Sequence, residues 1–229
     1  TAFPGMGYPL VPGYESVGRV AEAGSSTNYK VGEMVFVPGA ACFGDVRGLF
    51  GGAASRVVIP ALRAMRIKEE LGEQGTLLAL AATAYHAHSA PGLTQPELII
   101  GHGVLGRMMA RLAVLAGAKP VVWDTNPERR SGNVGYDVID PKDDTRANYR
   151  CICDVSGDAK LLDTLISRAA PNCEIVLAGF SQGCAMTLQT GLRYPQKLAG
   201  LLCLSGYLPI HTTVAAERSA PLLSSASGL

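Results

Sequence analysis

The sequence predicts an α/β protein in which a small β-rich unit precedes a doubly wound parallel sheet. The first 67 of its 229 residues are short β-prone runs broken by Gly and Pro, a spacing typical of a small all-β unit. From residue 98 onward, apolar strand-like runs alternate with helical patterns, which indicates a doubly wound sheet. Apolar residues make up 48% of the chain, enough to bury a sizeable core.

A glycine-rich turn between a strand and a helix is the most informative motif of the chain. Residues 98–100 form an apolar run, and Gly101, Gly103 and Gly106 follow at G-x-G-x-x-G spacing before a helical pattern that extends to Leu115. In a dinucleotide site the first glycine permits the turn, the second lets the backbone approach the pyrophosphate, and the third lets the helix pack closely. The motif therefore predicts dinucleotide binding.

Two further features of this stretch specify the ligand. The backbone N–H groups at Val104 and Leu105 begin the helix, where unpaired donors and the positive end of the helix dipole favour a pyrophosphate. A second apolar run, 121–123, ends at Asp124, 18 residues beyond Gly106. A carboxylate there would accept hydrogen bonds from both hydroxyls of the adenosine ribose and would repel a 2′-phosphate, so we expect NAD rather than NADP.

The next predicted strand supplies candidates for the other half of the cofactor. It covers 151–155, followed by Ser156 and Gly157, and the carboxyl edge of a parallel sheet is where a ligand binds. We therefore expect Asp154 and Ser156 on the nicotinamide-ribose side. Beyond them the pattern predicts an amphipathic helix over 160–170 and a further strand over 174–177.

The alanine-rich stretch 76–90 predicts a helix that leads into the doubly wound sheet. His86 and His88 are two residues apart and lie on different faces of that helix, which disfavours a shared ligand role. Both are explained by a structural or exposed position, whereas His86 could also relay a proton near a cofactor. The same alternatives hold for Tyr85.

Composition excludes several classes of partner. A net charge of +1 without long basic runs gives no electrostatic footprint for nucleic acid or an anionic membrane. The longest apolar run is well short of the roughly 20 residues that cross a bilayer, so we expect no membrane-spanning segment. Six cysteines without a C-x-x-C pair indicate reduced thiols and a cytoplasmic setting. Because the chain begins at Thr1 inside a Gly/Pro-rich segment, we expect it to be a fragment.

Ordered segments of residues 1–178 resemble the medium-chain dehydrogenases/reductases, which join a GroES-like β-barrel to a Rossmann domain. The segments are PLVPGYESVGRVAEAG, KVGEMVFVPG, GGAASRVVIP, LLALAATAYHA and IIGHGVLGRMMARL. Within that family, FVPGAACFGDVRGLFGGAAS, GHGVLGR and CDVSGD are most similar to zinc-independent members that act on bacteriochlorophyllides. The resemblance implies NAD-dependent oxidation of the hydroxyethyl group of this tetrapyrrole to an acetyl group, and it places Thr83 near the nicotinamide.

The chain departs from the zinc-dependent members of the family at their metal ligands. Their G-H-E motif is Gly13-Tyr14-Glu15 here, the position of a second metal-binding cysteine is Ala79, and only Cys42 lies where they carry a four-cysteine lobe. A tetrahedral zinc site needs three or four protein ligands, so we expect no metal, although zinc held by substituted ligands is the alternative.

Without a metal, catalysis requires the protein to position the substrate and move a proton while the cofactor takes the hydride. The candidates for the proton shuttle are Tyr14, Glu15, Tyr85 and His86.

A second resemblance begins near Ala178. Residues 179–183 form a G-x-S-x-G motif after a strand and before a helix, which is the context of a nucleophile elbow. Residues 175–218 resemble bacterial carboxylesterases of the acyl-protein thioesterase group, which would make Ser181 a nucleophile. The run IVLAGF suits both families, so residues 174–180 are the expected joint of a chimera.

The partners that Ser181 needs are not in the usual order. In α/β-hydrolases the acid precedes the histidine, whereas here Glu217, the only acid after Ser181, follows the only histidine, His211. We therefore do not expect conventional esterase turnover. An expected helix over 182–194 and strand over 200–204 instead continue the strand-helix rhythm and could complete the sheet.

The predicted organisation has three parts. Residues 1–75 form a partial GroES-like domain, residues 76–178 a Rossmann NAD-binding domain, and residues 179–229 a hydrolase-like segment with a loose tail. Three functional hypotheses follow: an NAD-dependent dehydrogenase, a serine hydrolase that depends on Ser181, and a catalytically inert chimera.

Overall fold

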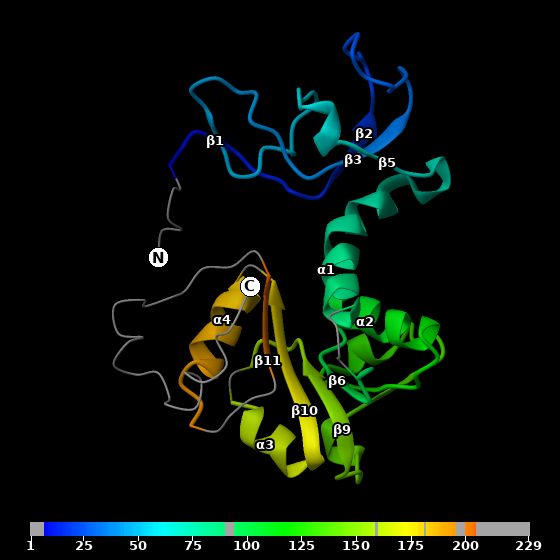
Figure 1. Cartoon of the computed structure of the whole chain (residues 1–229), viewed down its shortest axis with the longest axis vertical. Helices are drawn as coiled ribbons and strands as arrows, with labels where there is room; N and C mark the ends of the chain where they lie inside the picture. Colours follow the sequence, from blue (N-terminus) through cyan, green and yellow to red (C-terminus); the bar gives the residue numbers. More distant parts are fainter. Residues whose placement is uncertain (1–6, 90–93, 159, 181, 196–199, 205–229) are drawn as a thin grey trace. The chain divides into compact units, whose positions relative to one another are not determined.

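The structure is a computed structural model that describes residues 7–89, 94–158, 160–180, 182–195 and 200–204 (Figure 1). The chain forms two compact units, Thr1–Ala82 and Thr83–Leu229, and the boundary falls within helix α1 (Leu78–Ser89). Across the described ranges, every helix is too short or too polar to traverse a bilayer.

The first unit is built from short strands and 3-10 turns. Strands β2, β3 and β5 form an antiparallel sheet in the order β2-β3-β5, and β1 pairs in parallel with β4. The interior of the sheet comes from β3, whose Val35, Phe36 and Val37 are buried. The bounds are β1 Leu10–Val11, β2 Ser16–Arg19, β3 Met34–Val37, β4 Arg47–Gly48, η1 Ala61–Arg63, β5 Met65–Arg66 and η2 Glu69–Leu77.

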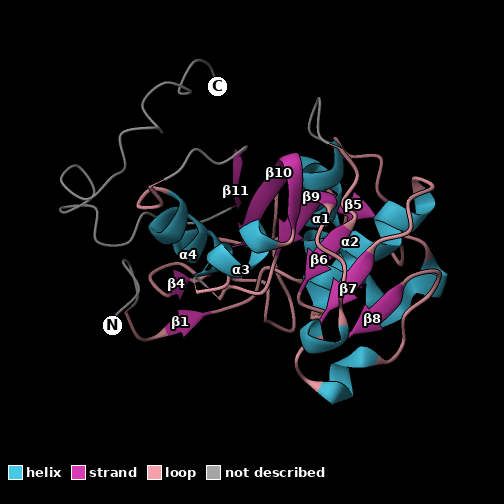
Figure 2. Ribbon diagram, turned by 90° about the horizontal axis from the view of Figure 1, so that it is seen from below, coloured by secondary structure: helices cyan, strands magenta, loops and turns pink. Residues whose placement is uncertain are grey.

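The second unit contains a six-stranded parallel sheet in the order β11-β10-β9-β6-β7-β8 (Figure 2). Numbered from β6, this is the strand order 3-2-1-4-5-6 of a doubly wound dinucleotide-binding fold. The expected α/β class is thus confirmed. The strands are β6 Leu98–Ile100, β7 Val121–Trp123, β8 Asp137–Ile139, β9 Tyr149–Asp154, β10 Ala169–Phe180 and β11 Gly200–Leu204.

Helices cover both faces of this sheet. Ile99 of β6 packs in one core cluster with residues of α1 and α2 (Val104–Leu115), and its neighbours Leu98 and Ile100 pack in the other with α3 (Leu162–Ser167). Because successive side chains of a strand point to opposite faces, both faces need apolar residues. This explains why the strands are continuous apolar runs.

The hydrolase-like segment supplies the last strands of the sheet. Strand β10 pairs with β9 on one side and with β11 on the other, in a parallel register that runs from Val176 opposite Gly200 to Phe180 opposite Leu204. Helix α4 (Gln182–Gly191) connects the two strands and packs on both (Figure 1). Residues beyond Ala178 therefore include the end of β10 and the whole of β11, which is the edge strand of the sheet.

Two predicted elements had the wrong extents. The helix predicted over 160–170 ends at Ser167, because Ala169 already pairs with Tyr149 of β9. The strand predicted over 174–177 begins five residues earlier, at Ala169. It contains a register shift between Ala169 and Glu174, where Asn172 has a φ of +61°, so no apolar alternation marks its start.

The other boundaries differ by a few residues. The helix predicted over 76–90 begins at Leu78, after the 3-10 segment η2, and the helix predicted over 182–194 ends at Gly191. The strand predicted over 200–204 is confirmed as β11.

A buried carboxylate ties β7 to β9 through their aromatic residues. Asp144, only 8% exposed, accepts hydrogen bonds from Trp123 Nε1 at 2.6 Å, from Tyr149 Oη at 2.7 Å and from the Arg146 backbone N–H at 2.8 Å. Burial alone would raise the pKa of Asp144, but these three hydrogen bonds outweigh it and lower the pKa.

We expect Asp144→Asn to lower the free energy of unfolding by about 1–3 kcal/mol, because an amide nitrogen would face a buried donor. Urea titration at pH 7 measures the loss, and Asp143→Asn is the matched control because Asp143 is exposed. A carboxyl whose folded pKa is lowered stabilises the fold above its unfolded pKa of about 3.9 and loses that effect as the pH falls through the folded pKa. The difference between wild type and Asp144→Asn should therefore shrink below about pH 4. Equal losses for the two variants would contradict this role.

Candidate functional site

The carboxyl edge of the parallel sheet brings together three of the predicted site residues. Gly101 follows β6, Asp124 follows β7, and Asp154 ends β9. In the sheet register, Ile100 lies opposite both Trp123 and Asp154, so the three strand ends are level. This edge is where doubly wound folds bind their ligands.

The glycine turn has the geometry that its spacing predicts. Gly101 has a φ of +99°, and a Cβ on Gly106 would lie 1.8 Å from the Gly101 carbonyl oxygen, so helix α2 packs directly on the turn. A Cβ on Gly103, by contrast, would meet no protein atom within 4 Å. Gly103 precedes Val104 at the N-terminus of α2, and no side chain of the described residues caps this end. The open backbone beside uncapped helix N–H groups fits a pyrophosphate.

Asp124 is buried and held by the backbone on both sides. Its Oδ2 accepts the His102 N–H at 2.8 Å and its Oδ1 accepts the Asn126 N–H at 2.8 Å. Each carboxylate oxygen can accept more than one hydrogen bond, so both oxygens retain capacity for ribose hydroxyls. The orientation of the carboxylate is thereby fixed relative to the glycine turn.

Asp154 and Ser156 form a local pair at the end of β9. Asp154 Oδ1 accepts the Ser156 N–H at 2.8 Å and the Ser156 hydroxyl at 2.6 Å. Burial raises the pKa of the Asp154 carboxyl, and the bonds from Ser156 oppose that shift. Above that pKa, the group is a buried acceptor at the sheet edge.

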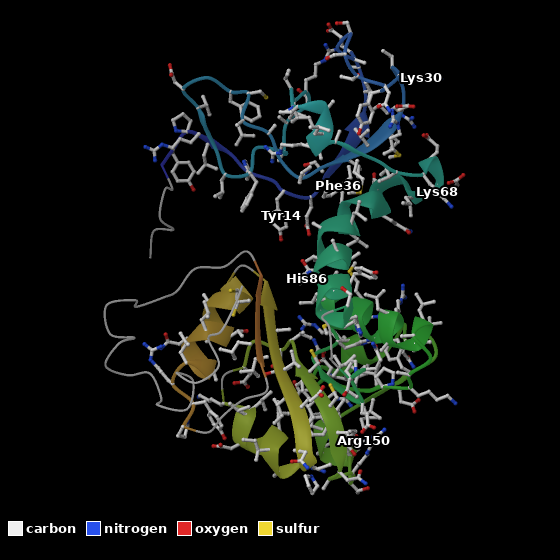
Figure 3. The ribbon with its side chains drawn as sticks, in the orientation of Figure 1. Tyr14, Lys30, Phe36, Lys68, His86 and Arg150 are labelled. Carbon is white, nitrogen blue, oxygen red and sulfur yellow. The ribbon has the colours of Figure 1, made fainter. Side chains whose placement is uncertain are left out.

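The other residues expected near the nicotinamide lie on α1. Thr83 is buried, next to Ala84, which packs in the core. Tyr85 is 63% exposed, and His86, labelled on α1 in Figure 3, is also exposed. His88 has a structural role, because its ring nitrogens bond Gln95 Oε1 at 2.9 Å and the Met109 carbonyl at 2.8 Å.

Tyr14 and Glu15 lie in the first unit, between β1 and β2 (Figure 3). The Tyr14 ring packs 5.1 Å from the Phe50 ring, and burial, with a smaller contribution from the Glu15 charge, raises the pKa of Tyr14. Glu15 Oε1 is a buried oxygen without a hydrogen-bond partner among the described residues. The described residues contain no group of three or more His, Cys, Asp or Glu that could hold a metal ion.

The spacing of the motif did not reveal His102, Arg107 and Tyr136, which surround the glycine turn. His102 is fully buried, and its ring bonds the Arg129 carbonyl and the Tyr136 hydroxyl. Burial lowers the pKa of the His102 ring. Position 102 can be any residue in the G-x-G-x-x-G motif. The only feature of the sequence that pointed to a role for His102 was a polar ring at the end of an apolar run.

The predicted nucleophile Ser181 lies outside the described residues, as do His211 and Glu217. The strand before this position and the helix after it are described. A Cβ on Gly179, near the end of β10, would lie 2.1 Å from the carbonyl carbon of Gly183 in α4. The end of the strand and the first turn of the helix are thus in close backbone contact.

Two protein families match the chain. The Alcohol dehydrogenase GroES-like domain matches residues 1–69, and the Phospholipase/Carboxylesterase family matches residues 137–223. The second match begins before the joint expected at residues 174–180.

Individual relatives divide in the same way. The 2-desacetyl-2-hydroxyethyl bacteriochlorophyllide A dehydrogenase of Cereibacter sphaeroides is 56% identical over 184 residues, which cover 78% of this chain and 58% of that protein. Acyl-protein thioesterase 1 of Schizosaccharomyces pombe is 37% identical over 76 residues, 33% of this chain and 34% of that protein. The chain resembles two families. It spans 58% of the length of the dehydrogenase that it matches.

The fold as a whole is similar to a solved dehydrogenase. A putative zinc-binding dehydrogenase from Sinorhizobium meliloti 1021, bound to NADP, has a TM-score of 0.61 at 18% identity. The likeness covers 92% of this chain and 66% of that one. This likeness shows that the two proteins share an architecture. The two resemblances predicted from the sequence are confirmed by the family matches and the relatives.

Substitution of the two glycines at the start of α2 should have unequal effects on stability. We expect Gly106→Ala to lower the free energy of unfolding by about 1–3 kcal/mol, because its Cβ would overlap the Gly101 carbonyl. Gly103→Ala should leave stability nearly unchanged, since its Cβ points into open space. Chemical unfolding of both variants measures this, and equal losses would show that α2 does not pack on the turn as described.

Proposed function

We propose that the chain is part of an NAD-dependent, zinc-independent dehydrogenase that oxidises the hydroxyethyl group of a bacteriochlorophyllide in bacteriochlorophyll synthesis. The observation that carries the proposal is the open backbone at Gly103 beside the buried Asp124. The substrate class is that in the name of the 56% identical relative, and this chain spans 58% of the length of that protein.

In this proposal, different residues along the carboxyl edge of the sheet contact different parts of the cofactor. Gly101, Gly103 and Gly106 shape the turn against the pyrophosphate, with donors from the backbone of Val104 and Leu105. A bound nicotinamide supplies the hydride acceptor.

The remaining contacts fall at the two ribose ends of the cofactor. Asp124 accepts hydrogen bonds from the adenosine ribose, and Asp154, Ser156 and Thr83 serve the nicotinamide side. The candidates to take the proton of the substrate alcohol remain Tyr14, Glu15, Tyr85 and His86. The cysteines are free thiols, which supports a reducing, cytoplasmic setting.

Asp124→Ala tests the cofactor assignment. Because hydrogen bonds to a carboxylate contribute about 1.5–3 kcal/mol, we expect the Kd for NADH to rise about tenfold to hundredfold. The Kd for NADPH should change less, since the variant no longer repels the 2′-phosphate. Titration of cofactor fluorescence measures both constants, with Asp137→Ala, an exposed carboxylate of β8, as the matched control. The assignment fails if wild type shows no saturable NADH binding or if Asp124→Ala binds like the control.

Zinc independence rests on the ligand positions. Where zinc-dependent members of the family carry a histidine and a cysteine, this chain carries Tyr14 and Ala79. We expect the purified protein to contain well under one equivalent of zinc and its NADH affinity to survive treatment with a chelator. Elemental analysis measures the first and fluorescence titration the second. A content of one tightly bound zinc per chain would contradict zinc independence.

A serine hydrolase is the second candidate, favoured by the close approach of Gly179 to Gly183 and by the Phospholipase/Carboxylesterase match. An activated-serine probe that labels wild type, but not Ser181→Ala, would support it. No labelling of folded protein would remove it. If neither the cofactor nor the probe binds, the third hypothesis, an inert chimera, is favoured.

A further inference from the structure

His102 occupies a position that the dinucleotide motif does not explain. Its backbone belongs to the glycine turn, yet its fully buried ring reaches away from it. Nδ1 lies 2.5 Å from the carbonyl oxygen of Arg129, and Nε2 lies 2.8 Å from the hydroxyl of Tyr136. The ring therefore connects the glycine turn to two segments that follow β7.

These partners specify one protonation state of the ring. The Arg129 carbonyl can only accept, so Nδ1 must carry a proton. The Tyr136 hydroxyl then donates to the bare Nε2. A proton on Nε2 would force the hydroxyl hydrogen to find another acceptor in a site where Tyr136 is 5% exposed. The network is satisfied by the neutral ring.

Burial and two arginines favour the neutral form of the ring, whereas the Arg129 carbonyl and the Asp124 charge oppose them. Arg107 and Arg111 face it from α2, and Asp124 faces it from the end of β7. Tyr136 faces it from the loop before β8, and the segment η3 (Pro127–Arg130) meets it through the Arg129 carbonyl. Burial is the largest influence on the pKa of His102 and lowers it, in the same direction as the two arginines.

Arg107 reinforces the same connection. Its guanidinium donates to the carbonyls of His102 at 3.2 Å, Arg129 at 3.0 Å and Ser131 at 2.8 Å. The turn 126–131 is thus fastened to the glycine turn by His102 and Arg107 together. Asp124 lies between the two turns, with Oδ2 on the His102 N–H and Oδ1 on the Asn126 N–H.

We propose that His102 is a positioning residue for the adenosine end of the dinucleotide site. Its neutral ring holds the turn 126–131 against the glycine turn, and the two turns together orient the Asp124 carboxylate toward the ribose. The inference rests on the proposed NAD-binding function. It adds a consequence that the motif lacks: protonation of Nε2 removes the acceptor of the Tyr136 hydroxyl and places a positive charge beside Arg107 and Arg111, while the Nδ1 bond to the Arg129 carbonyl remains. The weakened network around the two turns then lowers the affinity for the dinucleotide.

The test compares three variants with wild type. His102→Leu removes both ring bonds, His102→Asn keeps a donor in the place of Nδ1, and Tyr136→Phe removes only the hydroxyl. We expect His102→Leu to raise the Kd for NADH about tenfold and to narrow the preference for NADH over NADPH. His102→Asn should retain most of the wild-type affinity for NADH and most of the preference for NADH over NADPH. Binding of reduced nicotinamide mononucleotide, which lacks the adenosine, should be the same in all of them.

A pH series separates positioning from a merely structural role. Because the folded pKa of His102 is lowered, its protonation begins below about pH 6.5. Calorimetric titration with ADP-ribose between pH 8 and pH 5 should show wild-type affinity falling in the acidic part of that range. The affinity of His102→Asn should stay flat there, since an amide does not titrate.

The outcomes separate a failure of the positioning role of His102 from a failure of the proposed NAD-binding function. If wild type binds neither NADH nor ADP-ribose, both are overturned. If wild type binds and His102→Leu keeps its affinity and its NADH preference, only the positioning role is overturned. If His102→Leu fails to fold, His102→Asn and Tyr136→Phe are compared with wild type in its place. A pH profile of His102→Asn that matches wild type would overturn the proposal.

Discussion

The parallel pairing of β6 with both β7 and β9 is the constraint on which the rest of the second unit depends. Backbone hydrogen bonds fix the three strands in register, so their carboxyl ends finish together and deliver Gly101, Asp124 and Asp154 to one edge. Side chains add the finer geometry. Without Gly106, helix α2 could not approach the turn, and the uncapped N–H groups would not face this edge.

The same constraint explains how a hydrolase-like segment completes a dinucleotide-type sheet. A parallel ladder requires a matching backbone register and apolar residues on both faces, and β10 meets these demands with IVLAGF. Doubly wound and α/β-hydrolase folds share the strand-helix-strand unit. Helix α4 and β11 therefore take the place that the last strand of a Rossmann domain would fill.

The sequence allowed the glycine turn and Asp124 to be predicted because their chemistry is local. Each lies within a few residues of an apolar run that marks its strand. The start of β10 could not be predicted, since the irregular backbone at Asn172 interrupts its pattern. His102 was missed for another reason: its ring partners are 27 and 34 residues further along the chain, and only the folded sheet brings them close.

The joint expected at residues 174–180 lies inside β10, and this position has a mechanical consequence. A joint in a loop would let the two inherited pieces behave as separate bodies, whereas this strand is hydrogen-bonded along both edges. Both its pairing with β9 and its pairing with β11 lie within residues 137–223, which match the Phospholipase/Carboxylesterase family. Neither piece can then withdraw from the sheet without leaving a row of backbone donors and acceptors unpaired in an apolar core. We therefore expect the second unit to unfold cooperatively, because β10 is shared by both pairings.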